Sequence, residues 1–237
     1  MNVAPDDAHW AAYNAQQHDR PVRPLCQEVL DLAGPADGRS AVDLGSGAGR
    51  ETRALLGAGW QVHAVDGEPG VTAALADVDD KRLTIEVTHF GQLQALPPTD
   101  LVYAGYSLPY QPPEQFHRLW TLVRSSLRPG GWLAANLFGE RDSWAGAAGM
   151  TFFSGTAARR LFAGLEVVRW TEVDEDGPAF SGPKHWHVFD VIARRPGHSC
   201  AATARQLATR TAAQVDRGGP LVVGSVGSWV RTSGGCL

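Results

Sequence analysis

The feature that most constrains the fold of this 237-residue chain is a glycine-rich turn between a short apolar run and a helical pattern. Residues 41–52 read AVDLGSGAGRET, so the run ends near Asp43 and the turn contains Gly45, Gly47 and Gly49. Glycine is favoured where the backbone takes a positive φ or approaches a ligand closely, and a helix start offers free N–H groups. The pattern is typical of a nucleotide-cofactor loop in an α/β protein.

The spacing of the glycines separates two classes of cofactor loop. The dinucleotide fingerprint has its third glycine at the sixth position, where this chain has Arg50. A G-x-G-x-G loop preceded by an acidic residue instead resembles the first motif of class I S-adenosylmethionine (SAM)-dependent methyltransferases. An NAD-dependent oxidoreductase is therefore the disfavoured alternative.

A second acidic residue supports a cofactor site. The strand expected at residues 61–65 ends in Asp66 and continues directly into Gly67, Glu68 and Pro69. In a βαβ cofactor site, an acid at this position accepts hydrogen bonds from ribose hydroxyls. The alternative is that Asp66 caps a helix starting near Pro69. Both interpretations keep Asp66 at the cofactor edge of the sheet.

The rest of the pattern alternates strands with helices. Two N-terminal helices, at residues 6–20 and 25–33, precede strands at residues 41–44, 61–65, 83–89, 100–106 and 132–138. A clear helix follows Pro112 and Pro113 and ends at the Pro-Gly-Gly of residues 129–131. Two last strands, at residues 165–173 and 185–193, have too short a link for a crossover helix, which predicts an antiparallel hairpin.

The resemblance to class I methyltransferases covers residues 10–195. The matching segments are AVDLGSGAGR, VHAVDGEPG, RPGGWLAANLFGE and KHWHVFDVIARR, and the pattern is closest to small-molecule methyltransferases of the tellurite-resistance type. The resemblance implies a Rossmann-like, doubly wound α/β fold, with a mostly parallel seven-stranded sheet in the order 3-2-1-4-5-7-6 that ends in the hairpin. It also implies SAM as cofactor, bound by Asp43, Gly45, Ser46, Gly47, Gly49, Asp66, Gly67, His89, Phe90 and Tyr106.

One position departs from the family pattern. The end of the third strand commonly carries an aspartate that binds the adenine amino group, whereas the matching site here is His89, followed by Phe90. A neutral imidazole accepts one hydrogen bond, and Phe90 offers an apolar face for adenine. We therefore expect weakened, not abolished, cofactor affinity; the alternative is that His89 is a solvent-facing strand end.

Two histidines are the candidates for catalysis. In KHWHVFDVIA, strand alternation places His185 and His187 on one face and Trp186 and Val188 on the other. Their end of the hairpin lies at the carboxyl edge of the sheet, where ligands bind in open α/β folds. We predict that they bind the acceptor or act as its base; the alternative is a structural role in the core or hairpin.

The N-terminal helix and the loop after the fourth strand offer further contacts. The N-terminal helix has two interpretations. In one it forms a lid over the site with Trp10, Tyr13 and Arg20, and in the other it packs on the sheet. Tyr106 and Tyr110 lie where amino-methyltransferases carry an Asn- or Asp-Pro-Pro-Tyr motif, which this chain lacks. We expect this loop to wall the methionine end of the cofactor.

Composition excludes several other functions. A formal net charge of −4 provides no basic surface for nucleic acid, and no window has the ~18 apolar residues of a membrane span. The three cysteines form no C-x-x-C pair, and no metal site is expected. Without a signal-peptide pattern, the sequence predicts a cytoplasmic protein, and it leaves the oligomeric state open.

These features predict one catalytic domain over residues 1–196, with an N-terminal helical cap at residues 1–36. Residues 197–237 are rich in Ala, Thr, Gly and Ser, which predicts a mobile appendage of low complexity. The predicted function is methyl transfer from SAM to the O, S or N atom of a small molecule, or to a metalloid oxyanion. The alternative from another class is a non-catalytic SAM-binding sensor or partner subunit.

Overall fold

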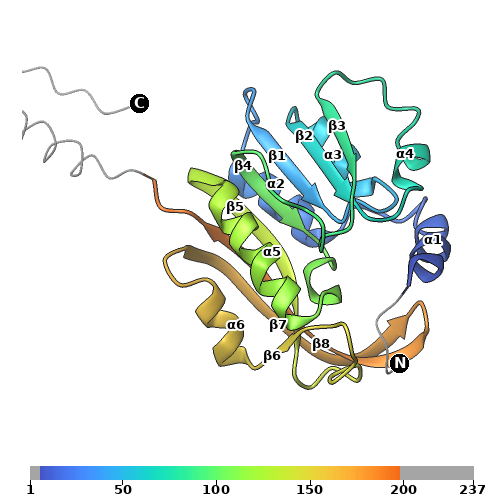
Figure 1. The fold of residues 1–237 in the computed structure, drawn as a ribbon. Helices are drawn as coiled ribbons and strands as arrows, with labels where there is room; N and C mark the ends of the chain where they lie inside the picture. Colours follow the sequence, from blue (N-terminus) through green and yellow to red (C-terminus); the bar gives the residue numbers. More distant parts are fainter. Residues whose placement is uncertain (1–5, 198–237) are drawn as a thin grey trace, which may run out of the picture. The chain divides into compact units, whose positions relative to one another are not determined.

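The computed structural model describes residues 6–197, which form one mixed sheet with helices on both faces (Figure 1). The strand order is β3-β2-β1-β4-β5-β8-β7, and β6 pairs with β5 outside this path. Only β8 pairs antiparallel with its neighbours, β5 and β7. The strands are β1 (Ser40–Leu44), β2 (Gln61–Asp66), β3 (Leu83–Val87), β4 (Thr99–Ala104), β5 (Leu127–Gly139), β6 (Phe152–Phe153), β7 (Glu166–Ala179) and β8 (Gly182–Arg194).

The helices form two layers around this sheet. The helices are α1 (Asp7–Gln16), α2 (Pro24–Ala33), α3 (Arg50–Gly57), α4 (Val71–Ala74), the 3-10 turn η1 (Leu108–Tyr110), α5 (Pro113–Ser126) and α6 (Gly155–Leu161). Helices α2 and α3 pack on one face in a core cluster that includes Val29 and Leu55, and α5 packs on the other with Phe116. No helix of the described residues is long and apolar enough to cross a membrane.

The predicted sheet order is confirmed. The structure adds the two-residue strand β6, so the final hairpin is β7–β8, and the observed order 3-2-1-4-5-8-7 has the same topology as expected. The expected mobile appendage lies outside the described residues, apart from residue 197.

Several predicted boundaries are wrong. Helix α1 ends at Gln16 and β3 ends at Val87, so His89 and Phe90 lie in the loop after the strand. Helix α5 ends at Ser126, and the Pro-Gly-Gly segment belongs to β5. These ends are set by sheet pairing, which local turn signals do not report.

The hairpin is longer than its sequence suggests. Backbone pairing continues from Asp174 opposite His187 to Ala179 opposite Gly182, so only Phe180 and Ser181 connect the strands. Most of the expected link, residues 174–184, is therefore part of the ladder. The sequence of this segment does not show the apolar alternation of a strand, because most of its charged residues are exposed on the edge strand β7. The extension carries the hairpin tip to α1, where the Phe180 and Tyr13 ring centroids lie 5.7 Å apart.

Candidate functional site

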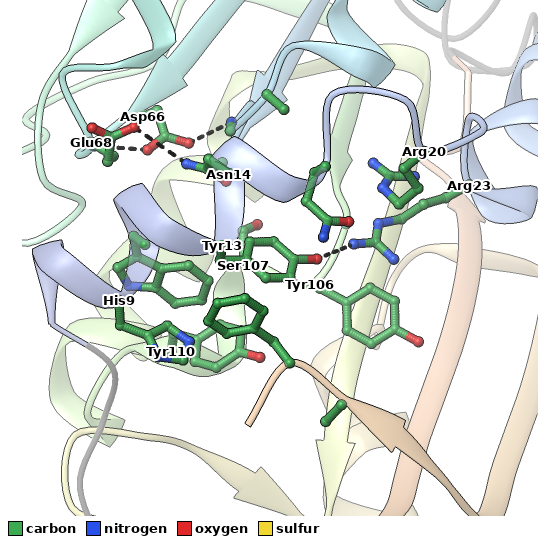
Figure 2. Close-up of a pocket in the computed structure, with 18 of the residues that line it drawn as sticks. His9, Tyr13, Asn14, Arg20, Arg23, Asp66, Glu68, Tyr106, Ser107 and Tyr110 are labelled. Carbon is green, nitrogen blue, oxygen red and sulfur yellow. Dashed lines mark hydrogen bonds between the residues drawn. The ribbon is translucent and has the colours of Figure 1, made fainter. Parts of the chain in front are cut away.

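A cavity of about 770 Å³ lies at the carboxyl edge of the sheet (Figure 2). The glycine loop after β1 and the loops after β2, β3 and β4 form one end, and the β7–β8 hairpin forms the other. Helix α1 covers the cavity from outside the sheet. The location follows from the parallel arrangement of β1, β2, β3 and β4, whose C-terminal loops meet at one edge.

Eight of the ten expected cofactor residues line this cavity. They are Gly45, Ser46, Gly47, Asp66, Gly67, His89, Phe90 and Tyr106. Asp66 accepts hydrogen bonds from the Gly47 N–H at 2.7 Å and the Glu68 N–H at 2.8 Å, which ties the first loop to the second (Figure 2). Burial raises the pKa of Asp66 in spite of these N–H donors.

The loops approach one another too closely for side chains at two glycines. Gly45 has φ +87, and a Cβ there would lie 2.4 Å from the Ser107 Cβ. A Cβ on Gly67 would lie 2.7 Å from the His89 Nδ1. Real Cβ atoms do not make such contacts, so both positions require glycine. The absence of side chains at these two glycines therefore leaves a narrow space between the loops that follow β1, β2, β3 and β4.

Unpaired polar atoms in the cavity wall fit a polar ligand. The Oγ atoms of Ser46 and Ser107 and the Nε of Arg20 are buried and have no hydrogen-bond partner within residues 6–197. All three residues line the cavity. Burying such groups without partners costs roughly 1 to 3 kcal/mol each, so a cofactor with hydroxyl, amino and carboxylate groups fits them.

Asp43 and Gly49 do not line the cavity, and the expectation that they contact the cofactor is corrected. Asp43 is 1% exposed and accepts the Thr52 hydroxyl hydrogen bond at 2.6 Å, beneath α3. Gly49 faces Leu75, whose Cδ2 would lie 2.5 Å from an added Cβ. Both residues support the loop from behind, Asp43 through its hydrogen bond to Thr52 of α3 and Gly49 through its close packing on Leu75.

The buried Asp43 makes stability depend on pH. Burial raises its pKa to about 7. Because the folded state binds this proton more tightly than the unfolded state, the free energy of unfolding falls as pH rises from about 4 through about 7. We expect Asp43→Asn to raise this free energy by about 1 to 3 kcal/mol at about pH 8 and to flatten the slope. Urea titrations at several pH values test this; an unchanged slope would contradict it.

His185 and His187, which the sequence predicts at the acceptor, do not line the cavity. His187 is fully buried; its Nδ1 accepts the Arg141 N–H bond at 3.0 Å, and its Nε2 lies 3.0 Å from a Glu172 oxygen. His185 lies 2.8 Å from Asp174. The alternation itself is as expected, but the opposite face, with Trp186 and Val188, lines the cavity. The alternation of side chains along a strand sorts them onto two faces of the sheet, but it does not determine which of the two faces lines the cavity.

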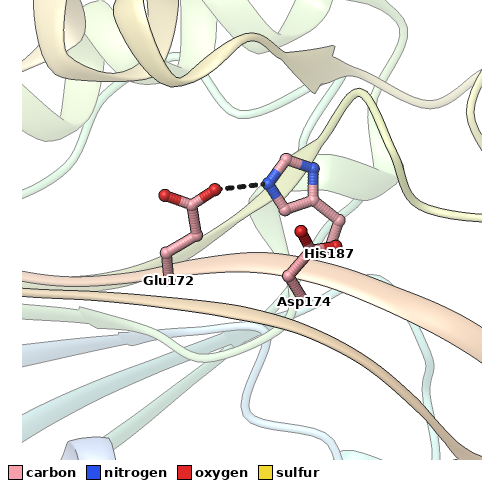
Figure 3. Close-up of side chains that lie close together, drawn as sticks. All are labelled: Glu172, Asp174 and His187. Carbon is pink, nitrogen blue, oxygen red and sulfur yellow. Dashed lines mark hydrogen bonds and ion pairs between the residues drawn. The ribbon is translucent and has the colours of Figure 1, made fainter.

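Glu172, Asp174 and His187 also place three metal-type donor atoms within 4.8 Å of one another (Figure 3). Arg141 already pairs with this cluster, at 2.6 Å from Glu172 and 2.7 Å from Asp174. Its guanidinium, together with His185, holds the pKa of Asp174 at about 2. We therefore assign the cluster to an ion-pair network that fastens the hairpin to the loop after β5.

The part of the cavity beside the β7–β8 hairpin is lined by aromatic rings, and the loop after β4, which also borders the glycine loop, contributes to it. Its rings come from α1, the loops after β4 and β5, and the hairpin; they are Trp10, Tyr13, Tyr106, Tyr110, Trp144, Phe180 and Trp186. We call this set the aromatic end. Sequence reasoning missed Phe180 and Trp186. The alternation in β8 was the available signal for Trp186, since it places this side chain opposite the two histidines.

Helix α1 acts as a cover and not as a core helix. None of its residues is buried, and its Tyr13 and Asn14 point toward the cavity (Figure 2). A Cβ on Gly47 would lie 2.9 Å from the Asn14 Oδ1, so α1 rests on the glycine loop. Of the two interpretations of the N-terminal helix, the structure favours the lid.

Comparisons with known proteins agree with this geometry. Residues 41–131 match a family described as a methyltransferase domain. No curated protein matches significantly. Among solved structures, the chain is similar to the 1,6-didemethyltoxoflavin N1-methyltransferase of Burkholderia thailandensis, bound to 1,6-didemethyltoxoflavin and S-adenosylhomocysteine (SAH). The two share 20% identity over 80% of this chain and 87% of that one, with a TM-score of 0.62.

Two other solved structures have the same fold. TehB from Haemophilus influenzae shares 14% identity over 79% of this chain and 67% of its own, with a TM-score of 0.62. The N-methyltransferase NodS from Bradyrhizobium japonicum, bound to SAH, shares 18% identity over 80% and 96%, with a TM-score of 0.61. The match over residues 41–131 and the sheet order show that this chain contains a SAM-dependent methyltransferase domain with the class I fold.

Proposed function

We propose that this methyltransferase acts on a small-molecule acceptor bound at the aromatic end, with SAM held across the glycine loop. The observation that carries the proposal is that one cavity contains both ends under the same cover, α1. A covered cavity suits a compact acceptor better than a polymer. The acceptor named for the Burkholderia neighbour, 1,6-didemethyltoxoflavin, is also a small molecule.

The proposed roles of the cofactor residues follow from their places. Asp66 accepts hydrogen bonds from the ribose, and Phe90 packs against the adenine, with His89 beside it. The backbone at Gly45 and Gly47 approaches the methionine part, for which the unpaired Nε of Arg20 is a donor. Bound SAM supplies an activated methyl group. The chain's own task is to orient the acceptor within reach of it and to exclude water.

Titration calorimetry with SAM, SAH and NAD tests the cofactor assignment. We expect binding of SAM and SAH and none of NAD. A turnover screen with phenols, thiols, amines and metalloid oxyanions then tests catalysis. SAM binding without turnover of any acceptor class would favour the non-catalytic sensor instead.

The histidines of β8 supply a further prediction. His185→Gln and His187→Gln are expected to leave SAM affinity and turnover within about twofold, because neither ring reaches the cavity. Asp174 and Asp176 raise the pKa of His185, so its contribution to stability is present at low pH and is lost as pH rises through the raised value. Kinetics and thermal unfolding at several pH values measure both effects. A large loss of turnover in a folded His185→Gln variant would return this residue to catalysis.

We also propose that residues 1–196 form the catalytic domain, with residues 1–36 as its N-terminal cap. The support is that α1 covers the cavity, while α2 contributes Leu25, Cys26, Val29 and Leu30 to the core. Deleting residues 1–17 is expected to weaken SAM retention while the sheet still folds, which circular dichroism can verify.

A further inference from the structure

Two of the chain's own cations lie against the aromatic end and indicate the charge of its acceptor. The Arg23 guanidinium lies 4.6 Å from the centroid of the Tyr106 ring. The Lys184 ammonium lies 3.6 Å from the Trp144 ring and 3.8 Å from the Trp186 ring. A cation over a ring is attracted by the negative charge of its face. Three of the seven rings of the aromatic end, Tyr106, Trp144 and Trp186, are therefore already paired with protein cations.

The two cations differ in how their charge is balanced. Lys184 is buried and lies 2.5 Å from Asp142, whose side chain is fully buried, so this pair is locally neutral. No ion pair within residues 6–197 involves Arg23, which donates instead to the Tyr13 hydroxyl at 2.9 Å (Figure 2). Two carboxylates interact electrostatically with Arg23, namely Glu51 and Asp190. Glu51 is committed to the Arg20 guanidinium at 2.8 Å and to the Arg23 backbone N–H at 3.0 Å, and Asp190 accepts a hydrogen bond from the Asn136 side chain.

No carboxylate of residues 6–197 forms an ion pair with Arg23, although Arg23 partly offsets the rise that burial causes in the pKa of Asp190. Burial raises the pKa of Tyr106 to about 12 and raises that of Tyr110 as well, so both stay neutral near neutral pH. Glu175 and Asp7 also line the cavity, but both are exposed at its rim. A half-buried cation facing a cavity favours a ligand with a negative charge.

The rings around Arg23 suit a flat partner. Trp10 and Tyr110 meet edge to face with centroids 4.7 Å apart, and Tyr106 and Trp186 do so at 6.0 Å. All four of these rings line the cavity, where they present aromatic surface to a ligand. Aromatic walls that come from several elements bind planar aromatic molecules, because binding buries apolar surface area and adds dispersion contacts.

We propose that the acceptor is a flat aromatic molecule with an acidic hydroxyl group, a phenol, which binds as its phenolate with Arg23 as the positive partner. This inference rests on the proposed function. Methylation forms a bond between the phenolate oxygen and the methyl carbon and breaks the carbon–sulfur bond of SAM, whose electron pair stays on sulfur. The phenolic proton leaves to solvent beforehand, so no histidine base is required.

Three flat probes of similar size test the proposal in the presence of saturating SAH: 7-hydroxycoumarin, coumarin and N-methylquinolinium. We expect 7-hydroxycoumarin to bind at least about tenfold more tightly than N-methylquinolinium at about pH 8. Its absorbance titration should give a pKa about one unit lower when bound than when free. With SAM in place of SAH, the product should be 7-methoxycoumarin. Equal or tighter binding of the cation, or no binding of any probe to the SAH complex, would overturn the proposal.

Arg23→Gln tests the residue itself, with Arg128→Gln as the matched control, because Arg128 is paired with Asp100 at the opposite edge of the sheet. Arg23→Gln should abolish the pKa shift of bound 7-hydroxycoumarin and leave coumarin and SAH affinity within about threefold. If it weakens SAH alone, Arg23 serves the cofactor carboxylate and the proposal is wrong. If the variant does not fold, the three-probe comparison on the unmodified chain still decides. If the chain binds neither SAM nor SAH, the proposed function is wrong. That outcome is distinct from a failure of the phenolate proposal, in which SAH binds and the probes do not behave as expected.

Discussion

Gly45→Ala is expected to lower SAM affinity by at least about 100-fold, or about 2.7 kcal/mol. The added Cβ would lie 2.4 Å from the Ser107 Cβ, and the φ of +87 is unfavourable for alanine. The loop after β1 must therefore move relative to the loop after β4, and both line the cavity. Calorimetry with SAM measures the loss, and circular dichroism shows whether the sheet remains folded.

Other glycines of the chain provide controls for this prediction. Gly57 ends α3, has no atom within 4 Å of an added Cβ and does not have a positive φ. Gly57→Ala should therefore leave SAM affinity unchanged. Gly47→Val is expected to lower SAM affinity by at least about tenfold, since the φ of +48 is unfavourable for valine and an added Cβ would lie 2.9 Å from the Asn14 Oδ1. Unchanged SAM binding in folded Gly45→Ala would remove the loop from the cofactor site.

Asp66→Ala is expected to weaken SAM and SAH equally, by about 10- to 150-fold, which corresponds to about 1.5 to 3 kcal/mol. Both ligands carry the same ribose, and the variant loses a charge-assisted acceptor for its hydroxyls. The substitution also removes the acceptor of the Gly47 and Glu68 N–H groups, so the two loops lose a direct connection.

Asp77→Ala is the matched control for Asp66→Ala. Asp77 is an exposed acid that pairs with Arg53 on the surface and does not line the cavity. It should leave both affinities within about twofold. A loss for SAM but not for SAH in Asp66→Ala would contradict a ribose role and indicate an interaction with the sulfonium charge.

The cofactor end was largely predictable from the sequence because its residues follow strand ends in the chain. Gly45, Gly47 and Asp66 come directly after predicted parallel strands, and parallel strands bring such positions to one edge. His89 and Phe90 reach the same edge although β3 stops two residues earlier than expected. Errors of one or two residues in a strand end do not move a loop to another part of the fold.

The aromatic end could not be predicted with the same success, since its members are far apart in the chain. Trp10 lies on α1, Trp144 follows β5, and Phe180 lies in a turn whose position depends on the full length of the hairpin ladder. The charged residues of β7 carry no apolar alternation, so the sequence suggested a loop. Only the pairing with β8 extends the hairpin far enough to meet α1.

The class of fold, the order of the sheet and the position of the glycine loop could be predicted from the sequence, because strand and helix periods and glycine spacing are local properties of the chain. Which face of β8 lines the cavity depends on tertiary packing. His185 and His187 alternate with Trp186 as expected, yet Phe189 on the histidine face packs into the core with α5. That packing commits the histidines to the ion-pair network and leaves Trp186 in the cavity, since burying Phe189 fixes the orientation of every neighbour in the strand.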